Sequence, residues 1–275
     1  MAKCTQSKLR KGDNYMEAYM YPILNQAYKI LGFEVERNND KETQLRGLDA
    51  TLNFKNIYKL TVDEKCYTTR NTYVYGANTL FNNIDGKDEA FTFAFELEFV
   101  IKDDDGNIIG RVKGWIHRVS RENKMNDYFV LVFPNAEKEY NAELGAEVFC
   151  EVKQLELCLI SYEAIKKLIE TEGFDYDKTI EEILSSPEVL SNPNKLVRFC
   201  KKPNANGKVV YSGHLHEQPI NFVIPKKLLM KHSIVSAAFI CEGERGNERI
   251  TMWKKYDRKV LNDMGRDMSD FIKVE

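Results

Sequence analysis

The spacing of apolar and polar residues along the chain predicts a mixture of helices and strands. Apolar residues recur at helical spacing over 14–31, with Asp13 as the predicted N-cap and Gly32 as the stop. Pro22 interrupts this segment, so the pattern predicts either a kinked helix or two helices with Pro22 opening the second. Residues 33–36 then alternate as a short strand.

Alternation with a period of two predicts most of the following elements to be strands. The strand at 47–54 carries Asp49 on its polar face, and the strand at 58–66 projects Asp63 and Lys65 from one face. Further strands are predicted at 91–101, 108–119, 128–133, 148–160, 209–211, 220–224 and 235–241. Helices are predicted at 162–172, around 180–184, at 226–231 and at 257–271.

This order of elements predicts an α/β fold of the α+β type, with helices flanking a central mixed β-sheet. A loop-rich passage at 175–207, which contains three prolines, is the predicted boundary. We therefore expect a core over 1–174 and a C-terminal appended region over 175–275. The appended region either stands apart or packs on the core as one domain.

Composition restricts the class of protein. With 275 residues, 43% of them hydrophobic and 30% charged, the chain is long enough to bury a sizeable core, which argues against disorder, collagen and coiled coil. No apolar run approaches the length of a membrane span, and the first residues lack the apolar segment of a secretion signal. The six cysteines form no CxxC pair. These features predict a cytoplasmic protein with reduced thiols and no membrane partner.

The distribution of charge is more informative than its total. The net charge is −2, yet residues 195–232 hold eight basic side chains and one acidic one. A segment this basic suits contacts with phosphates, although a lysine-rich solvated surface would have the same composition. The side chains predicted to bind nucleic acid are Arg70, Lys201, Lys202, Lys226 and Lys227.

Two carboxylates and a lysine form the main candidate for chemistry. Neighbouring antiparallel strands lie about 4.8 Å apart, so Asp49 and Asp63 at facing positions would share one Mg²⁺, a hard ion that binds carboxylates and keeps several waters. Lys65 follows about 6–7 Å along the same face, where it would orient a water or neutralise a phosphate. A plain ion pair between Asp63 and Lys65 would give the same sequence, and both interpretations stay open.

The same residues carry a resemblance to a known family. A helix, a strand, a strand with Asp49 and a strand with the tripeptide Asp63-Glu64-Lys65 resemble the catalytic core of the PD-(D/E)xK nuclease superfamily, which has the restriction-endonuclease-like fold. The resemblance covers roughly residues 8–135, and Leu48 replaces the leading proline of the motif.

The resemblance implies a metal-dependent endonuclease that cleaves DNA, with Mg²⁺ as cofactor and Mn²⁺ as its substitute. It implies that Asp49 and Asp63 bind the metal, that the backbone carbonyl of Glu64 is a further ligand, and that Lys65 acts in catalysis. Glu17 on the first helix takes the place of the accessory acid of the family.

Several alternatives follow from the sequence and stay open. A catalytically silent module of the same fold that binds nucleic acid or protein would keep the same elements. Duplex and branched DNA are both compatible with the pattern, and a homodimer is expected because cutting two strands with one site per chain needs two chains or two visits. Lys113, Trp115 and His117 share one face of a predicted strand, which is either a substrate surface or a solvated sheet face.

Overall fold

The computed structural model describes the residues 8–55, 58–66, 92–103, 108–117, 124–171, 173–192, 196–199, 207–213, 218–244 and 247–255. The chain divides into two compact units, each assembled from separate segments: the first unit from 1–86, 125–161 and 230–275, and the second from 87–124 and 162–229. The predicted α+β class, with a mixed sheet and flanking helices, is confirmed. Within the described residues, no helix is long and apolar enough to cross a membrane.

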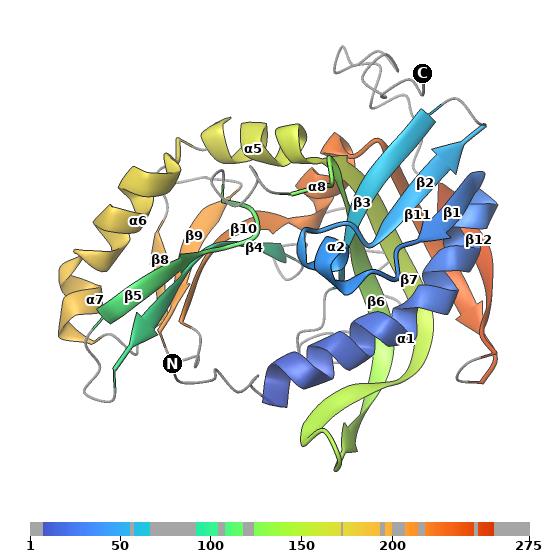
Figure 1. Cartoon of the computed structure of the whole chain (residues 1–275), viewed down its shortest axis with the longest axis horizontal. Helices are drawn as coiled ribbons and strands as arrows, with labels where there is room; N and C mark the ends of the chain where they lie inside the picture. The colour runs from blue at the N-terminus through green and yellow to red at the C-terminus, as the bar shows by residue number, and fades with distance from the viewer. Residues whose placement is uncertain are drawn as a thin grey trace. The chain divides into compact units, whose positions relative to one another are not determined.

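The first unit is built on a seven-stranded sheet with the strand order β1-β2-β3-β6-β7-β11-β12 (Figure 1). Neighbouring strands are antiparallel except for the parallel pair of β3 and β6, which makes the sheet mixed. The strands are β1 (Phe33–Arg37), β2 (Ala50–Phe54), β3 (Tyr58–Cys66), β6 (Tyr128–Asn141), β7 (Ala146–Ser161), β11 (Val235–Glu242) and β12 (Arg249–Lys255).

Helix α1 (Lys8–Leu31) packs against β1, β7 and β12 of this sheet. Its buried side chains recur every three or four residues, as a helix with one apolar face requires, and they join the core of the first unit. Burial of each large aliphatic side chain in such a core contributes about 1.5–3 kcal/mol. The buried apolar residues of α1 are Met16, Met20, Ile23, Leu24, Ala27, Tyr28 and Leu31.

The ends of α1 test two details of the prediction. Gly32 follows the helix with φ of 89°, a conformation that glycine adopts without strain, so the predicted stop is confirmed. The predicted N-cap Asp13 is wrong, because the helix begins at Lys8 and runs through Asp13. The helix also continues through Pro22, whose ring is exposed. Because proline has no N–H, the carbonyl four residues earlier lacks its helical donor, and water can bond it instead.

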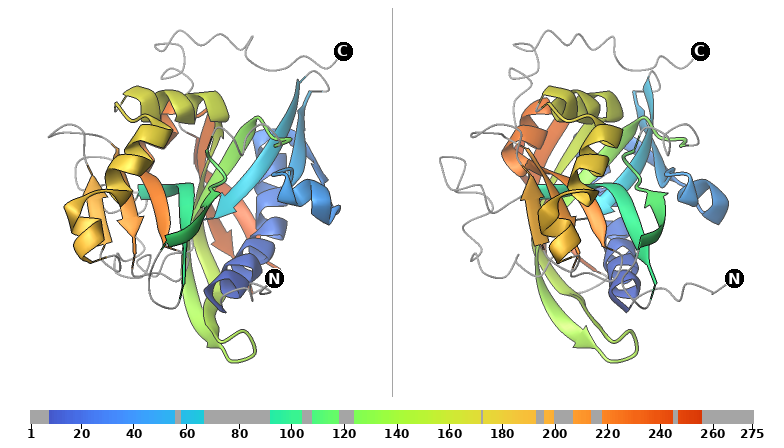
Figure 2. Two further views of the ribbon diagram at one scale, coloured as in Figure 1. Left: turned by 60° about the vertical axis from the view of Figure 1, so that its left-hand side comes forward. Right: turned by 90° about the vertical axis from the view of Figure 1, so that its left-hand side faces the viewer.

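Strands β6 and β7 are longer than their apolar cores predict. Pairing of β6 with β3 ends at Val132 and pairing of β7 with β11 begins at Gln154, and beyond these points the two strands pair only with each other in the described part of the chain. This part of the hairpin projects past the rest of the sheet in Figures 1 and 2. The predicted strand at 148–160 covers part of it, but the polar sequence of 134–141 gave no apolar alternation from which a strand could be predicted.

The second unit contains a five-stranded antiparallel sheet with the order β5-β4-β10-β9-β8. Its strands are β4 (Thr92–Lys102), β5 (Ile108–Lys113), β8 (Leu196–Phe199), β9 (Lys208–Ser212) and β10 (Pro219–Pro225). The helices of its segments are α5 (Tyr162–Thr171), α6 (Tyr176–Leu184), α7 (Pro187–Ser191) and the start of α8 (Lys226–His232). Phe174, between α5 and α6, packs edge-on against Phe222 of β10 with ring centroids 5.2 Å apart.

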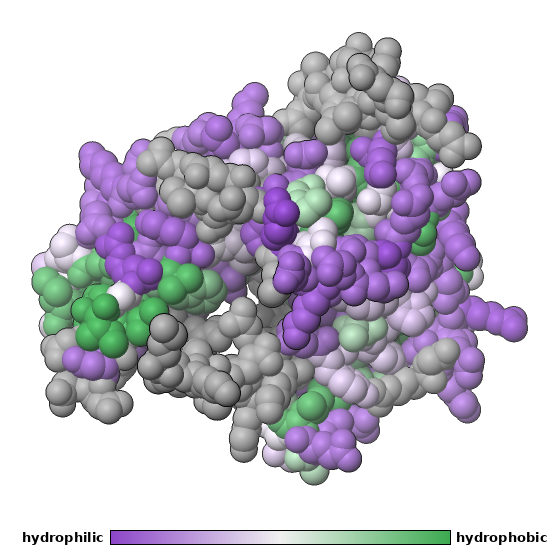
Figure 3. All heavy atoms as spheres, viewed as in Figure 1, coloured by the Kyte–Doolittle hydropathy of each residue, from purple (hydrophilic) through white to green (hydrophobic). Residues whose placement is uncertain are grey.

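The edge of this second sheet is unusually apolar. Strand β5 has one strand neighbour, β4, and an apolar patch is visible where β5 lies (Figure 3). The exposed aliphatic side chains of β4 and β5 are Ile101, Ile108, Ile109 and Val112. Edge strands are more often protected by charge, proline or bulges.

The division into units differs from the predicted boundary at residue 174. Strands β11 and β12 lie beyond that boundary yet extend the first sheet from β7, and β10 lies beyond it yet pairs with β4 in the second sheet. Local periodicity carries no information on such long-range pairing. Strands β8 and β12, helix α7 and the short helix α2 (Lys41–Leu45), capped by the Asp40 side chain, were not predicted. The helix predicted at 257–271 lies outside the described residues.

Candidate active site

The Asp49 and Asp63 carboxyl groups come together where β2 begins beside β3. Ala50 pairs with Val62, and the Asp49 backbone N–H donates to the Val62 carbonyl at 3.0 Å. A regular continuation would have joined the Asp49 N–H to the Asp63 carbonyl, so the paired register ends at Ala50 and Val62. The Asp49 and Asp63 side chains are nevertheless close enough to interact. The predicted start of the strand was too early, because β2 begins at Ala50 and Asp49 directly precedes it.

The two carboxylates are close enough to perturb each other. Burial, and then the negative charge of Asp63, raise the pKa of Asp49 to about 8. The positive charge of Lys65 and the Glu64 backbone N–H, which donates to Asp49 Oδ2 at 2.8 Å, offset only part of this rise. In the metal-free protein Asp49 therefore keeps its proton near neutral pH.

Lys65 lies beside Asp63 on the same face of β3. Its Nζ is 2.7 Å from Asp63 Oδ1, and the two side chains are 27% and 4% exposed. Burial alone would lower the pKa of Lys65, but the negative charges of Asp63, Glu17 and Asp49 raise it above its usual value. Lys65 is thus a cation held at the carboxylates, and the ion pair between Asp63 and Lys65 that the alternative interpretation expected is present.

Glu17 approaches this group from α1. Its negative charge contributes to the raised pKa values of Lys65 and Tyr21, which places it in the same electrostatic neighbourhood. Glu17 also lines a small cavity together with Tyr21, Glu64 and Cys66. About 10 Å³ of this cavity is open to the centre of a water-sized sphere, which is room for about one water. The structure therefore brings together Glu17, Asp49, Asp63 and Lys65.

Sequence reasoning missed the partners of the Glu64 side chain. Glu64 is buried, and its carboxylate accepts hydrogen bonds from the Tyr28 hydroxyl and from Arg37 Nη1. A signal was present, because alternation places Glu64 on the same face as the buried Leu60 and Val62. A carboxylate on an apolar face requires donors from another element.

The donor set is compatible with a hard divalent cation. Within the described part of the chain, no group of three or more His, Cys, Asp or Glu side chains has an arrangement that could hold a metal ion. A Mg²⁺ site, however, needs only one or two carboxylates, since the ion keeps several waters. Asp49 and Asp63 are such a pair, and burial together with the Asp63 charge raises the pKa of Asp49.

The residues predicted to bind nucleic acid have mixed outcomes. Arg70, Lys201 and Lys202 lie outside the described residues. Lys227 lies in α8. Lys226, in the same helix, is only 4% exposed. Its burial is unfavourable to the predicted contact with a phosphate backbone, because a buried ammonium is not accessible to one.

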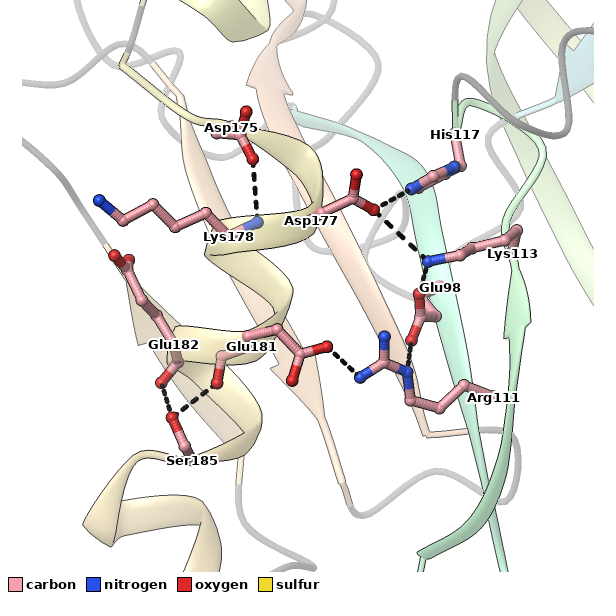
Figure 4. Close-up of polar contacts among 10 residues, drawn as sticks. All are labelled: Glu98, Arg111, Lys113, His117, Asp175, Asp177, Lys178, Glu181, Glu182 and Ser185. Atoms are coloured by element: carbon pink, nitrogen blue, oxygen red, sulfur yellow. Dashed lines mark hydrogen bonds and ion pairs between the residues drawn. The ribbon is translucent and has the colours of Figure 1, made fainter.

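Lys113 and His117 belong to an ion-pair network in the second unit (Figure 4). Lys113 Nζ lies 2.7 Å from Glu98 Oε2 and 3.7 Å from Asp177 Oδ1, and Arg111 also pairs with Glu98. His117 Nε2 lies 3.3 Å from Asp177 Oδ1. Glu98 and His117 are buried, while Arg111, Lys113 and Asp177 are partly exposed, so the network joins β4, β5 and α6 at the border of the unit's interior.

Comparison with known proteins finds no relative of this chain. No family model matches the sequence, and no similar protein is found among curated proteins or solved structures. The functional argument therefore depends on the residues of this chain.

Proposed function

We propose that this protein is a metal-dependent endonuclease that hydrolyses phosphodiester bonds in DNA. The observation that carries the proposal is the close approach of the Asp49 and Asp63 carboxyl groups, with the Lys65 ammonium 2.7 Å from Asp63. Two strands that place two acids and a lysine together in this way match the arrangement expected of a PD-(D/E)xK site. The choice of DNA as substrate comes from the resemblance to that superfamily.

Asp49 and Asp63 would hold Mg²⁺, or Mn²⁺ in its place, with the Glu64 carbonyl as a further ligand by resemblance to the family. When bound, the ion supplies Lewis acidity toward a phosphate oxygen and lowers the pKa of a water. The donors are hard oxygens, which suits either cation.

The remaining chemistry belongs to side chains of the chain itself. Lys65 would neutralise charge that develops on the phosphate, a role that its location beside the carboxylates supports. Glu17 would provide an outer carboxylate, since its negative charge acts on Lys65.

Metal titration and plasmid nicking test the proposal directly. Wild-type protein should bind Mg²⁺ or Mn²⁺ by calorimetry and nick supercoiled plasmid, and the Asp49→Asn, Asp63→Asn double variant should lose both. Lys65→Met should retain metal binding, and its nicking rate should fall about 100-fold or more, as expected when one stabilising charge is removed.

A second pair of acids supplies a matched control. Glu137 and Glu151 face each other across antiparallel strands, and Lys153 lies near both carboxylates. The Glu137→Gln, Glu151→Gln variant should bind metal and nick plasmid as the wild type does. A wild-type protein that binds DNA but neither binds metal nor nicks would contradict the proposal and support a catalytically silent module.

A further inference from the structure

The Glu64 carboxylate is held by two donors from two different elements. The Tyr28 hydroxyl of α1 donates to Oε1 and Arg37 Nη1 of β1 donates to Oε2, so each oxygen has its own donor. Burial, and then the neighbouring Glu64 charge, raise the pKa of Tyr28 well above its usual value, which keeps the hydroxyl protonated as a donor. Hydrogen bonds to an ionised group are among the strongest that proteins form.

Arg37 is itself fixed in place. Its Nε donates to Asn25 Oδ1 at 2.8 Å, and its guanidinium carbon lies 4.7 Å from the centroid of the Tyr21 ring. These contacts use the planar guanidinium fork and its face, and a lysine ammonium would not reproduce them. The network therefore joins α1, β1 and β3 through one charged group.

The backbone of Glu64 lies at the centre of the proposed metal site. Its N–H donates to Asp49 Oδ2 at 2.8 Å, and its chain neighbours are Asp63 and Lys65. A shift of this residue would move all three side chains, because two are joined to it by peptide bonds and the third by a hydrogen bond. The side chain on one face of the strand thus controls the geometry on the other face.

We infer that Tyr28 and Arg37 are positioning residues for the metal site, acting through Glu64 on Asp49. This inference rests on the proposed function. Residues that orient metal ligands through a second layer of hydrogen bonds typically change metal affinity 10–100-fold when they are removed. A purely structural role, in which the two residues only neutralise a buried charge, would affect stability without a specific effect on the metal.

The test uses Tyr28→Phe and Arg37→Lys, which are conservative enough to preserve the core. The matched control is Tyr19→Phe, because the Tyr19 hydroxyl on the same helix also donates to a buried carboxylate, that of Glu248. Two readouts are taken: exchange of the Glu64 amide proton by NMR in metal-free protein, and Mn²⁺ affinity by calorimetry. Thermal unfolding of each variant identifies any loss of the fold.

The expected result is specific to the Glu64 network. Both Tyr28→Phe and Arg37→Lys should accelerate exchange of the Glu64 amide and weaken Mn²⁺ binding about tenfold or more, while Tyr19→Phe changes neither. Unchanged exchange of the Glu64 amide, or an equal loss of Mn²⁺ affinity in Tyr19→Phe, overturns this inference and leaves the proposed function standing. A wild-type protein that binds no Mn²⁺ overturns the proposed function, and this inference with it.

Discussion

Asp49 shows how strongly neighbours determine the chemistry of one residue. Nothing in its local sequence distinguishes it from an ordinary aspartate at the start of a strand. In the fold, burial and the neighbouring Asp63 raise its pKa to about 8, so the folded chain retains a proton that the unfolded chain releases near pH 4. Ionised Asp49 is therefore destabilising in the metal-free protein.

Asp49→Asn should stabilise the metal-free protein, because asparagine keeps the shape and the oxygen that accepts from the Glu64 N–H without the charge. Since the folded state binds more protons than the unfolded state between about pH 4 and 8, wild-type stability falls as pH rises through this window. The advantage of the variant should grow over the same window and reach about 1–2 kcal/mol or more in urea unfolding. An advantage that does not depend on pH would contradict this assignment.

His117 should give the opposite dependence at lower pH. Burial first, and the Lys113 charge second, lower its pKa, and Asp177 offsets only part of this effect. Protonation is then favoured in the unfolded chain, so the contribution of His117 to stability is present above about pH 6.5 and is lost as pH falls below that value. His117→Gln should flatten this part of the urea-unfolding profile, and an unchanged profile would exclude His117 as its source.

The backbones of β4 and β5 leave no room for a side chain at the end of β5. A Cβ atom on Gly114 would lie 2.1 Å from the Glu96 carbonyl oxygen of the neighbouring β4, a distance that only backbone displacement can relieve. The Gly114 N–H also donates to the Leu97 carbonyl at 2.9 Å, so the contact forms part of the pairing of the two strands. Glycine at this position is required by space and not by its φ angle.

Gly114→Ala should therefore cost about 3 kcal/mol or more, in the upper range of single substitutions. Gly173→Ala is the control, because Gly173 has φ of 82° and open space around its Cβ position, so alanine there should cost only about 1 kcal/mol. Thermal unfolding compares the two variants. Equal losses would show that the close approach to Glu96 is relieved without cost.

The whole molecule is built from two units whose segments alternate along the chain. The chain passes between the units after residues 86, 124, 161 and 229, so neither unit is a continuous stretch of sequence. The last described strands, β11 and β12, complete the sheet that holds the candidate site.

Truncation after residue 174 should prevent folding of the first unit. A fragment of 1–174 lacks β11, which pairs with β7 from Gln154 to Leu159 and buries Ala237 and Phe239 in the core. Loss of this strand would expose the β7 edge and its apolar face. Circular dichroism and NMR dispersion of the fragment, beside the full chain, check the expectation, and a well-dispersed fragment spectrum would contradict it.

The sequence by itself determined those features that depend on local periodicity. Alternation located β3 from Tyr58 to Cys66 and placed Asp63 and Lys65 on one face, and the helical period located most of α1. The site prediction followed from these faces, since the approach of Asp49 to Asp63 needs only the pairing of two strands close in sequence.

Only the tertiary structure decided which distant segments meet. Pairing of β7 with β11 depends on complementary surfaces some 80 residues apart in sequence, and no local pattern encodes it. The partners of Glu64 depend in the same way on how α1 and β1 lie against β3. Alternation predicts the face on which a side chain lies, but burial and charge pairing depend on the element that covers that face, so the pKa of Asp49 and the network around Glu64 belong to the fold.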